Sequence, residues 1–217
     1  RAIGNLLRHA KINNHLRSVP QIDRIKEATK RKRLVTMGEV EFLCSEANRI
    51  LLNGCQFSDY VRLLAFSGAR ASEAVNLKWS DVDFRNCLLT IGSDGMSKNA
   101  KPRTIEFNGE LKRHLNDVHS RRVESSQWIF PAKRTGGLDC IKSFRCHLNR
   151  VFARTDIQRF GFHHLRHFFA STCVMSGIDF TTVARWLGHS DGGALLAKTY
   201  SHLSDEHARF QAESLKF

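Results

Sequence analysis

The sequence predicts a mainly α-helical domain of the α+β class, with a small antiparallel β-sheet near its middle. Over most of the chain, apolar residues recur every three to four positions, which is the period of an amphipathic helix. Two short runs, 87–91 and 103–107, have the composition of strands and flank a connection that contains Gly and Ser. With 217 residues, 41% of them apolar, the chain is large enough to bury a core.

The first 33 residues differ in composition from the rest. They carry ten Lys or Arg residues against Asp23 and Glu27, which is a net charge of +8 out of a total of +13. Apolar residues at helical spacing predict one helix that ends near Pro20, and a basic linker over 23–33 follows it. Because the chain begins at Arg1 and not at Met, we expect it to be part of a longer protein.

The overall charge indicates a polyanionic partner. A formal net charge of +13 favours association with nucleic acid, although a solvated basic tail accounts for part of it equally well. There is no run of 18 apolar residues, and the N-terminus does not resemble a signal peptide. We therefore expect no membrane segment and a cytoplasmic, nucleoid-associated protein.

Neither the six cysteines nor the eleven histidines predict a bound metal. The cysteines form no Cys-x-x-Cys pair and several fall within apolar patterns, so we expect reduced, partly buried thiols. His163, His164 and His167 lie close together, but no Glu follows the first of them as in His-Glu-x-x-His. Arg166 between them would repel a cation, so we expect no metal and no cofactor.

Two helices are expected after the linker. Thr36 and Glu39 have the spacing of a capping box, and the helix that they open is expected to stop at Gly54. Ser58 is a candidate cap of the second helix, for which Gly68 is the expected end.

Arg70 follows the second helix in the pattern Ser-Gly-x-Arg-x-x-Glu, which ends at Glu73. A helix that begins near Arg70 places Glu73 one turn further on, where its carboxylate braces the local structure while Arg70 faces a phosphate. The alternative is an ordinary surface Arg–Glu pair, worth less than about 1 kcal/mol.

The two expected strands are joined by a loop that contains two lysines. Residues 79–83 are expected to form a turn before the first strand. Lys98 lies five residues before Arg103, which opens the second strand. Lys101, three residues after Lys98, is the alternative candidate for a functional lysine. Most loop lysines are simply solvated, so the loop alone assigns no role to either.

Two helices are expected between the second strand and residue 160. Asn108 is a candidate cap of the first. Residues 141–152 have apolar side chains at helical spacing and are expected to form the second.

The C-terminal segment gathers polar residues that suit a phosphodiester. His163 and Arg166 are three residues apart, so they share one face of a helix that is expected to end at Gly177. His189 directly follows Leu-Gly at the end of a short helix, and Tyr200 lies in the helix after that. An arginine can hold a phosphate through two parallel hydrogen bonds.

The short helix before His189 has two candidate caps, Asp179 and Thr181, and Gly188 is its expected end. A last helix is expected from Ser204, with apolar residues that we expect to dock on a neighbouring protomer.

His-x-x-Arg, then Leu-Gly-His, then a Tyr resembles the C-terminal half of the tyrosine recombinase (phage integrase) family. This resemblance predicts an upstream arginine before x-x-Glu and a lysine on a hairpin, which Arg70 and Lys98 match. It covers about residues 35–205. It implies an integrase-type catalytic domain over 34–217, preceded over 1–33 by the end of a DNA-clamping (core-binding) module and the basic linker.

Some positions depart from the family pattern. His164 stands where Asp is frequent and Ser67 where Thr is frequent, and the eleven residues from His189 to Tyr200 exceed the common spacing. His164 and His167 are interpreted as structural or phosphate-adjacent residues.

The resemblance implies a site-specific DNA recombinase (integrase), an enzyme that breaks and rejoins strands without metal or ATP. Tyr200 would attack the phosphodiester and become joined to the 3′ phosphate. Arg70 and Arg166 would hold the non-bridging oxygens and balance the charge of the transition state.

Three further side chains receive roles from the same resemblance. His163 and His189 would orient the phosphate, and His163 would also accept the proton of Tyr200. Lys98 would donate a proton to the departing 5′ oxygen. The implied partners are double-stranded DNA recombination sites and three more copies of the chain, as a homo-tetramer on DNA that is compatible with a monomer without DNA.

Two other functions fit part of the pattern. Residues 173–187, with a glycine between two short helices, fit a helix-turn-helix DNA-binding module without catalysis, which leaves His189 and Tyr200 without a role. A topoisomerase would relax supercoils by the same tyrosine chemistry without exchanging strands between partners.

Overall fold

The computed structural model describes three stretches of the chain: residues 2–19, 33–93 and 102–200. The chain divides into two compact units, 1–32 and 33–217. The described part of the first unit is helix α1 (Ala2–Ile12) and turns that follow it, so this helix ends before the boundary expected near Pro20. None of the helices in the described stretches is long and apolar enough to cross a membrane.

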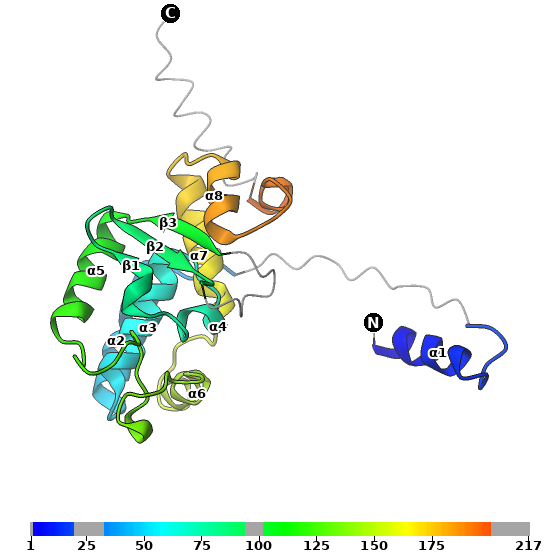
Figure 1. Ribbon diagram of the computed structural model, residues 1–217, viewed down its shortest axis with the longest axis horizontal. Helices are drawn as coiled ribbons and strands as arrows, with labels where there is room; N and C mark the ends of the chain where they lie inside the picture. The colour runs from blue at the N-terminus through cyan, green and yellow to red at the C-terminus, as the bar shows by residue number, and fades with distance from the viewer. Residues whose placement is uncertain (1, 20–32, 94–101, 201–217) are drawn as a thin grey trace, which may run out of the picture. The chain divides into compact units, whose positions relative to one another are not determined.

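The second unit is built from helices around a small antiparallel sheet, which confirms the predicted fold class (Figure 1). Its helices are α2 (Met37–Ile50), α3 (Gly54–Ser67), α4 (Ala71–Ala74), α5 (Gly109–Ser120), α6 (Arg145–Phe152), α7 (Phe162–Met175) and α8 (Phe180–Leu187). Its strands are β1 (Val82–Asp83), β2 (Leu88–Ile91) and β3 (Arg103–Glu106), and its 3₁₀ turns are η1 (Trp79–Asp81) and η2 (Lys133–Thr135).

The sheet has the order β1-β2-β3, with both pairs antiparallel. Leu89 is opposite Val82 on one side and Ile105 on the other, and these three side chains are buried. Residues 79–83 were expected to form only a turn. The expectation is wrong for the last two of them, because a strand of two residues is too short to show an alternating pattern.

The capping box that opens α2 is confirmed. The backbone N of Glu39 donates to Thr36 Oγ1 at 3.2 Å, and the backbone N of Thr36 donates to Glu39 Oε2 at 2.9 Å. The expected helix end at Gly54 is wrong, since α2 ends at Ile50 and Gly54 is the first residue of α3. A Cβ at Gly54 would lie 2.2 Å from the carbonyl oxygen of Ala47, so glycine is needed for the close approach of the two helices.

Helix α3 lies at the centre of the core. Ser58 is not its cap, because Ser58 lies inside the helix, where its hydroxyl donates to the carbonyl oxygen of Cys44 at 2.9 Å. Tyr60 is buried and donates its hydroxyl to the carbonyl oxygen of Ala71 at 3.0 Å, as expected for a core tyrosine. Gly68, with a φ of +63°, ends α3 in the left-handed conformation that the sequence predicts.

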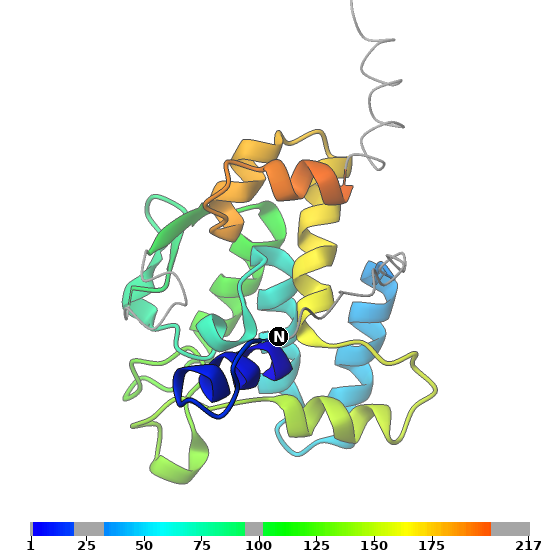
Figure 2. The same cartoon turned by 90° about the vertical axis from the view of Figure 1, so that its right-hand side faces the viewer.

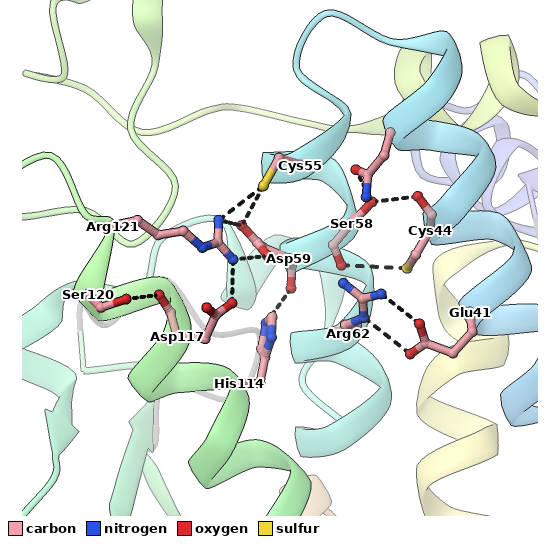
Figure 3. A network of polar contacts seen from close by, with 11 residues as sticks. Glu41, Cys44, Cys55, Ser58, Asp59, Arg62, His114, Asp117, Ser120 and Arg121 are labelled. Carbon is pink, nitrogen blue, oxygen red and sulfur yellow. Dashed lines mark hydrogen bonds and ion pairs between the residues drawn. The ribbon is translucent and has the colours of Figure 1, made fainter.

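A network of polar contacts fixes α3 between its neighbours (Figure 3). The buried carboxylate of Asp59 accepts two hydrogen bonds of 2.8 Å from Arg121, at the end of α5. His114 in α5 donates from Nε2 to the carbonyl oxygen of Asp59 at 2.9 Å. On the other side of α3, Arg62 forms an ion pair with Glu41 in α2. These contacts hold the middle of α3 between α2 and α5.

The helices after the sheet agree with most of the predicted boundaries. The side chain of Asn108 caps α5 by accepting from the backbone N of Leu111 at 2.8 Å. Helix α6 begins at Arg145 and not at 141, because the backbone N of Ile141 instead donates to Phe130, beside a bridge between two extended segments.

The two helices that carry the C-terminal motifs begin and end near the predicted residues. Helix α7 ends at Met175, two residues before Gly177. Of the two candidate caps of α8, Asp179 is the one that accepts from the backbone, from Thr182 N at 2.8 Å, and Gly188 ends the helix with a φ of +67°.

Residues 194–200 form a further helix beside α7 and α8 (Figure 2). They contribute Leu196 and Tyr200 to an apolar cluster whose other buried members come from those two helices: Phe169, Ala170, Cys173, Val174, Val183, Ala184 and Leu187. The helix expected from Ser204 lies outside the described residues.

Candidate active site

Arg70 lies in the turn between α3 and α4, two residues after Gly68, which packs against α7 and the end of α8. A Cβ at Gly68 would lie 2.5 Å from the ring of Phe169 in α7 and 2.8 Å from the side chain of Leu187 in α8, so the glycine permits their close approach. Arg70 donates from Nη1 to Glu73 Oε1 at 2.7 Å and from its backbone N to Glu73 Oε2 at 2.9 Å. Its side chain is 30% exposed, so part of the guanidinium faces solvent.

Glu73 has a second arginine partner, which the sequence did not lead us to expect. Arg103, the first residue of β3, donates from its two terminal nitrogens to Glu73 Oε1 at 3.1 Å and Oε2 at 2.7 Å. Burial opposes the ionisation of Glu73, but the hydrogen bonds and charges of Arg103 and Arg70 outweigh it and lower its pKa to about 2. Glu73 is therefore ionised at neutral pH.

Arg166 is buried where α3, α7 and α8 meet. It donates from Nη1 to the carbonyl oxygen of Gly68 at 2.9 Å, and from Nη2 to the carbonyl oxygen of Leu187. Both acceptors lie at the C-terminal end of a helix, where the helix dipole favours a cation. Burial, together with the charges of Arg70 and Arg103, lowers the pKa of Arg166 to about 9, so it remains protonated at neutral pH.

The three guanidinium groups are close enough to influence one another, and the carboxylate that pairs with two of them is Glu73. This leaves a local excess of positive charge around Arg70 and Arg166. An excess of this kind attracts an anion such as a phosphodiester, whose non-bridging oxygens accept hydrogen bonds from guanidinium groups.

His189 lies at the same junction, one residue after Gly188. Its backbone N donates to the carbonyl oxygen of Ala184 at 2.9 Å, and its Nδ1 is buried without a hydrogen-bond partner among the described residues. Burial and the charge of Arg166 lower its pKa, although Asp191 opposes this effect. The ring is therefore neutral at neutral pH and keeps one N–H group with which to donate.

The side chain of Tyr200 is buried, and it belongs to the same chain as Arg70 and Arg166. Its side chain is 6% exposed, and its hydroxyl forms a hydrogen bond with Nδ1 of His167. Burial raises the pKa of Tyr200 to about 12, and the charge of Arg166 opposes this rise. The phenol is thus protonated at neutral pH and needs a proton acceptor before it can act as a nucleophile.

The described hydrogen bond of the Tyr200 hydroxyl is with His167, which the sequence did not single out as the base. The sequence predicted that His163 would accept the Tyr200 proton, whereas the histidine in contact with the phenol is one turn further along α7. His163 is exposed, and its ring centroid lies 4.5 Å from that of His167. His163 and His167 are four residues apart, so they share a face of the helix. This spacing is the sequence signal that could have indicated His167 as a second candidate for the base.

Lys98 and its competitor Lys101 lie outside the described residues. The strands that flank their loop are described, and Ile91 at the end of β2 is opposite Arg103 at the start of β3. Among the described candidates, the fold brings four to one junction of helices: Arg70, Arg166, His189 and Tyr200.

The family model described as the phage integrase family matches residues 33–207. A tyrosine recombinase XerA from Thermococcus onnurineus is 30% identical over 156 residues, which cover 71% of this chain and 53% of that protein. A tyrosine recombinase XerC from Anoxybacillus flavithermus is 26% identical over 155 residues, covering 69% and 51%. The chain thus spans about half the length of these curated relatives.

Two solved structures resemble the fold. The Tn1549 transposon integrase in complex with a circular intermediate DNA aligns with a TM-score of 0.72 and 17% identity, over 99% of this chain and 77% of that one. A crystal structure of XerA recombinase aligns with a TM-score of 0.62 and 21% identity, over 88% and 68%. The family match extends over most of the chain and includes the residues gathered at the helix junction. The chain therefore belongs to the phage integrase family.

Proposed function

We propose that the chain is the catalytic domain of a site-specific DNA recombinase that cuts and rejoins strands through a 3′-phosphotyrosyl intermediate. The observation that carries this proposal is the convergence of Tyr200, Arg166 and His189 at one junction, with Arg70 beside them. A buried phenol beside a surplus of guanidinium groups suits the attack of a tyrosine on a phosphodiester.

In the cleavage step, a bond forms between Tyr200 Oη and phosphorus while the bond from phosphorus to the 5′ oxygen breaks. The phenol proton passes to an imidazole, for which His167 is the residue in contact. Arg70 and Arg166 hold the non-bridging oxygens, and His189 donates a hydrogen bond to the same phosphate.

The departing 5′ oxygen needs a proton, which we assign to Lys98 on the loop between β2 and β3. The energy of the broken bond is kept in the phosphotyrosine, so the 5′-OH of a second strand can reverse the step without ATP. His163 is exposed in the first turn of α7 and packs against His167. Its proposed role is to orient the phosphate.

The proposed partners are double-stranded DNA and further copies of the chain in a tetramer. The net charge of +13 supports the first, as do relatives named tyrosine recombinases and a structural neighbour titled as a DNA complex. Residues 1–33 are proposed to end a DNA-clamping module. The six free cysteines fit a cytoplasmic protein.

The test begins with a pool of duplexes that have a randomised centre. Duplexes that the chain retains under native conditions are sequenced, and the enriched duplex is made with a nick that lets the cleaved fragment diffuse away. A denaturing gel then detects DNA joined to protein. We expect an adduct with the unmodified chain, none with Tyr200→Phe, and an adduct with the matched control Tyr60→Phe.

Two outcomes would contradict the proposal. A duplex that binds but forms no adduct indicates a DNA-binding module without catalysis. In the second outcome, the chain forms the adduct and relaxes a supercoiled plasmid that contains the enriched site, yet never joins two duplexes of different length. That result indicates a topoisomerase.

A further inference from the structure

The side chain of Arg103 is buried, and it contacts segments that carry two different parts of the candidate site. Its side chain is 7% exposed, and it opens β3 directly after the loop that contains Lys98. Arg103 is not among the six side chains to which the family resemblance gives a role.

The first contact of Arg103 is with the carboxylate that holds Arg70. Each oxygen of Glu73 accepts from both arginines: Oε1 from Nη1 of Arg70 and Nη1 of Arg103, and Oε2 from the backbone N of Arg70 and Nη2 of Arg103. The Glu73 side chain is 4% exposed, so water cannot readily replace these donors. Without Arg103, Glu73 loses two of the four hydrogen bonds that set its orientation, and Arg70 loses a fixed partner.

The second contact is with the end of α8. Nε of Arg103 donates to the carbonyl oxygen of Trp186 at 2.7 Å. Gly188 packs on the same side chain so closely that a Cβ there would lie 2.9 Å from Arg103 Cδ. His189 follows Gly188 directly, so the position of its backbone depends on that of Arg103.

Glu106, at the other end of β3, strengthens the link between β3 and α8. Its carboxylate accepts from Arg185 at 3.0 Å and also from Nε1 of Trp186. The strand β3, which follows the Lys98 loop, is thereby attached to α8, the helix that precedes His189 (Figure 1).

We propose that Arg103 is a positioning residue that sets Arg70, through Glu73, and His189, through the end of α8, at the relative placement that cleavage requires. This inference rests on the proposed function. We assign Arg103 no contact with the phosphate, because its side chain is only 7% exposed and each of its three nitrogens already donates to Glu73 or Trp186. A lysine carries the same charge but lacks the planar fork that makes these contacts together.

The test compares two scissile groups in the duplex enriched by the native selection described above. One is the natural phosphodiester, and the other is a methylphosphonate, in which a methyl group replaces a non-bridging oxygen and removes the negative charge. A misplaced Arg70 slows cleavage of the charged group more than that of the neutral one, because the neutral group needs less stabilisation by cations. A general loss of folded protein slows both equally.

We expect Arg103→Ala to slow adduct formation on the phosphodiester by about 100-fold, the loss typical of a misplacement of about 1 Å. On the methylphosphonate the loss should be less than about tenfold. Arg103→Lys should remain slow on the phosphodiester, since charge without the fork does not restore the geometry. Arg113→Ala, which removes an exposed arginine paired with Glu110, should match the unmodified chain.

Three results would overturn the inference. One is an equal loss of adduct-forming rate on the phosphodiester and the methylphosphonate. The others are full activity of Arg103→Lys and full activity of Arg103→Ala. If Arg103→Ala does not fold, the same comparison of the two groups is made with Arg103→Lys, and equal losses again overturn it. Failure of the proposed function is distinct, because the unmodified chain would then form no adduct with either group.

Discussion

The hydroxyl of Tyr200 forms a hydrogen bond with Nδ1 of His167, on the same helix that carries Arg166. This contact lies within one chain, so the nucleophile proposed here docks beside its own arginines. Because burial raises the pKa of Tyr200 to about 12, the phenol depends on a neighbouring base at neutral pH.

We therefore expect His167→Ala to slow adduct formation by at least about 100-fold, which is the lower range for the loss of a general base. DNA binding should be largely unchanged, since the ring forms a hydrogen bond with the buried Tyr200. The measurement is the single-turnover rate on a nicked duplex, with His163→Ala in parallel. A larger loss for His163→Ala than for His167→Ala would return the base to His163.

The pKa of Glu73 predicts how stability depends on pH. The folded state lowers this pKa from its ordinary value of 4.5 to about 2, so the folded protein favours the carboxylate. The resulting stabilisation, about 3 kcal/mol, is fully present above pH 4.5 and is lost as the pH falls toward 2.

Glu73→Gln tests this dependence. In urea unfolding, the free energy that separates this variant from the unmodified chain should be largest at pH 7 and should shrink between pH 4.5 and pH 2.5. A difference that does not change with pH would show that the two arginines do not hold the charged form.

The close approach of α2 and α3 predicts an unequal effect of two identical substitutions. Gly54→Ala places a Cβ against the carbonyl oxygen of Ala47, and we expect it to lower the free energy of unfolding by about 1 to 3 kcal/mol. Gly109→Ala, at the open first position of α5, meets nothing within 4 Å and should be neutral or slightly stabilising. Thermal unfolding of both variants checks this, and equal effects would contradict the helix contact.

The polar network around α3 predicts a loss of stability far from the candidate site (Figure 3). Asp59→Ala removes two charged hydrogen bonds from Arg121 and should lower the free energy of unfolding by about 2 kcal/mol. Arg113→Ala, which breaks an exposed pair, should cost less than about 0.5 kcal/mol. Denaturant titration measures both, and an unchanged midpoint for Asp59→Ala would show that the network does not stabilise α3.

Features with local causes were predictable from the sequence. Thr36, Asn108 and Asp179 cap the helices that follow them, because a cap needs only a side chain within three residues of the N–H group that it accepts from. Gly68 and Gly188 end their helices for an equally local reason, since glycine readily adopts a positive φ.

Features that depend on distant segments were not predictable in this way. Glycine is needed at position 54 because α2 passes close to it, and β1 exists because β2 pairs with it. The contacts of Arg103 join residues 30 and 83 positions apart. The contact between His167 and Tyr200 depends on how the helix of residues 194–200 packs on α7.

The most direct test of the central claim is to identify the residue that becomes joined to DNA. The adduct formed with the enriched duplex is digested with nuclease and protease, and the peptide that retains a nucleotide is sequenced by mass spectrometry. We expect the nucleotide on Tyr200, linked through a 3′ phosphate. A nucleotide on Tyr60 or on any other side chain, or a 5′ linkage, would contradict the account.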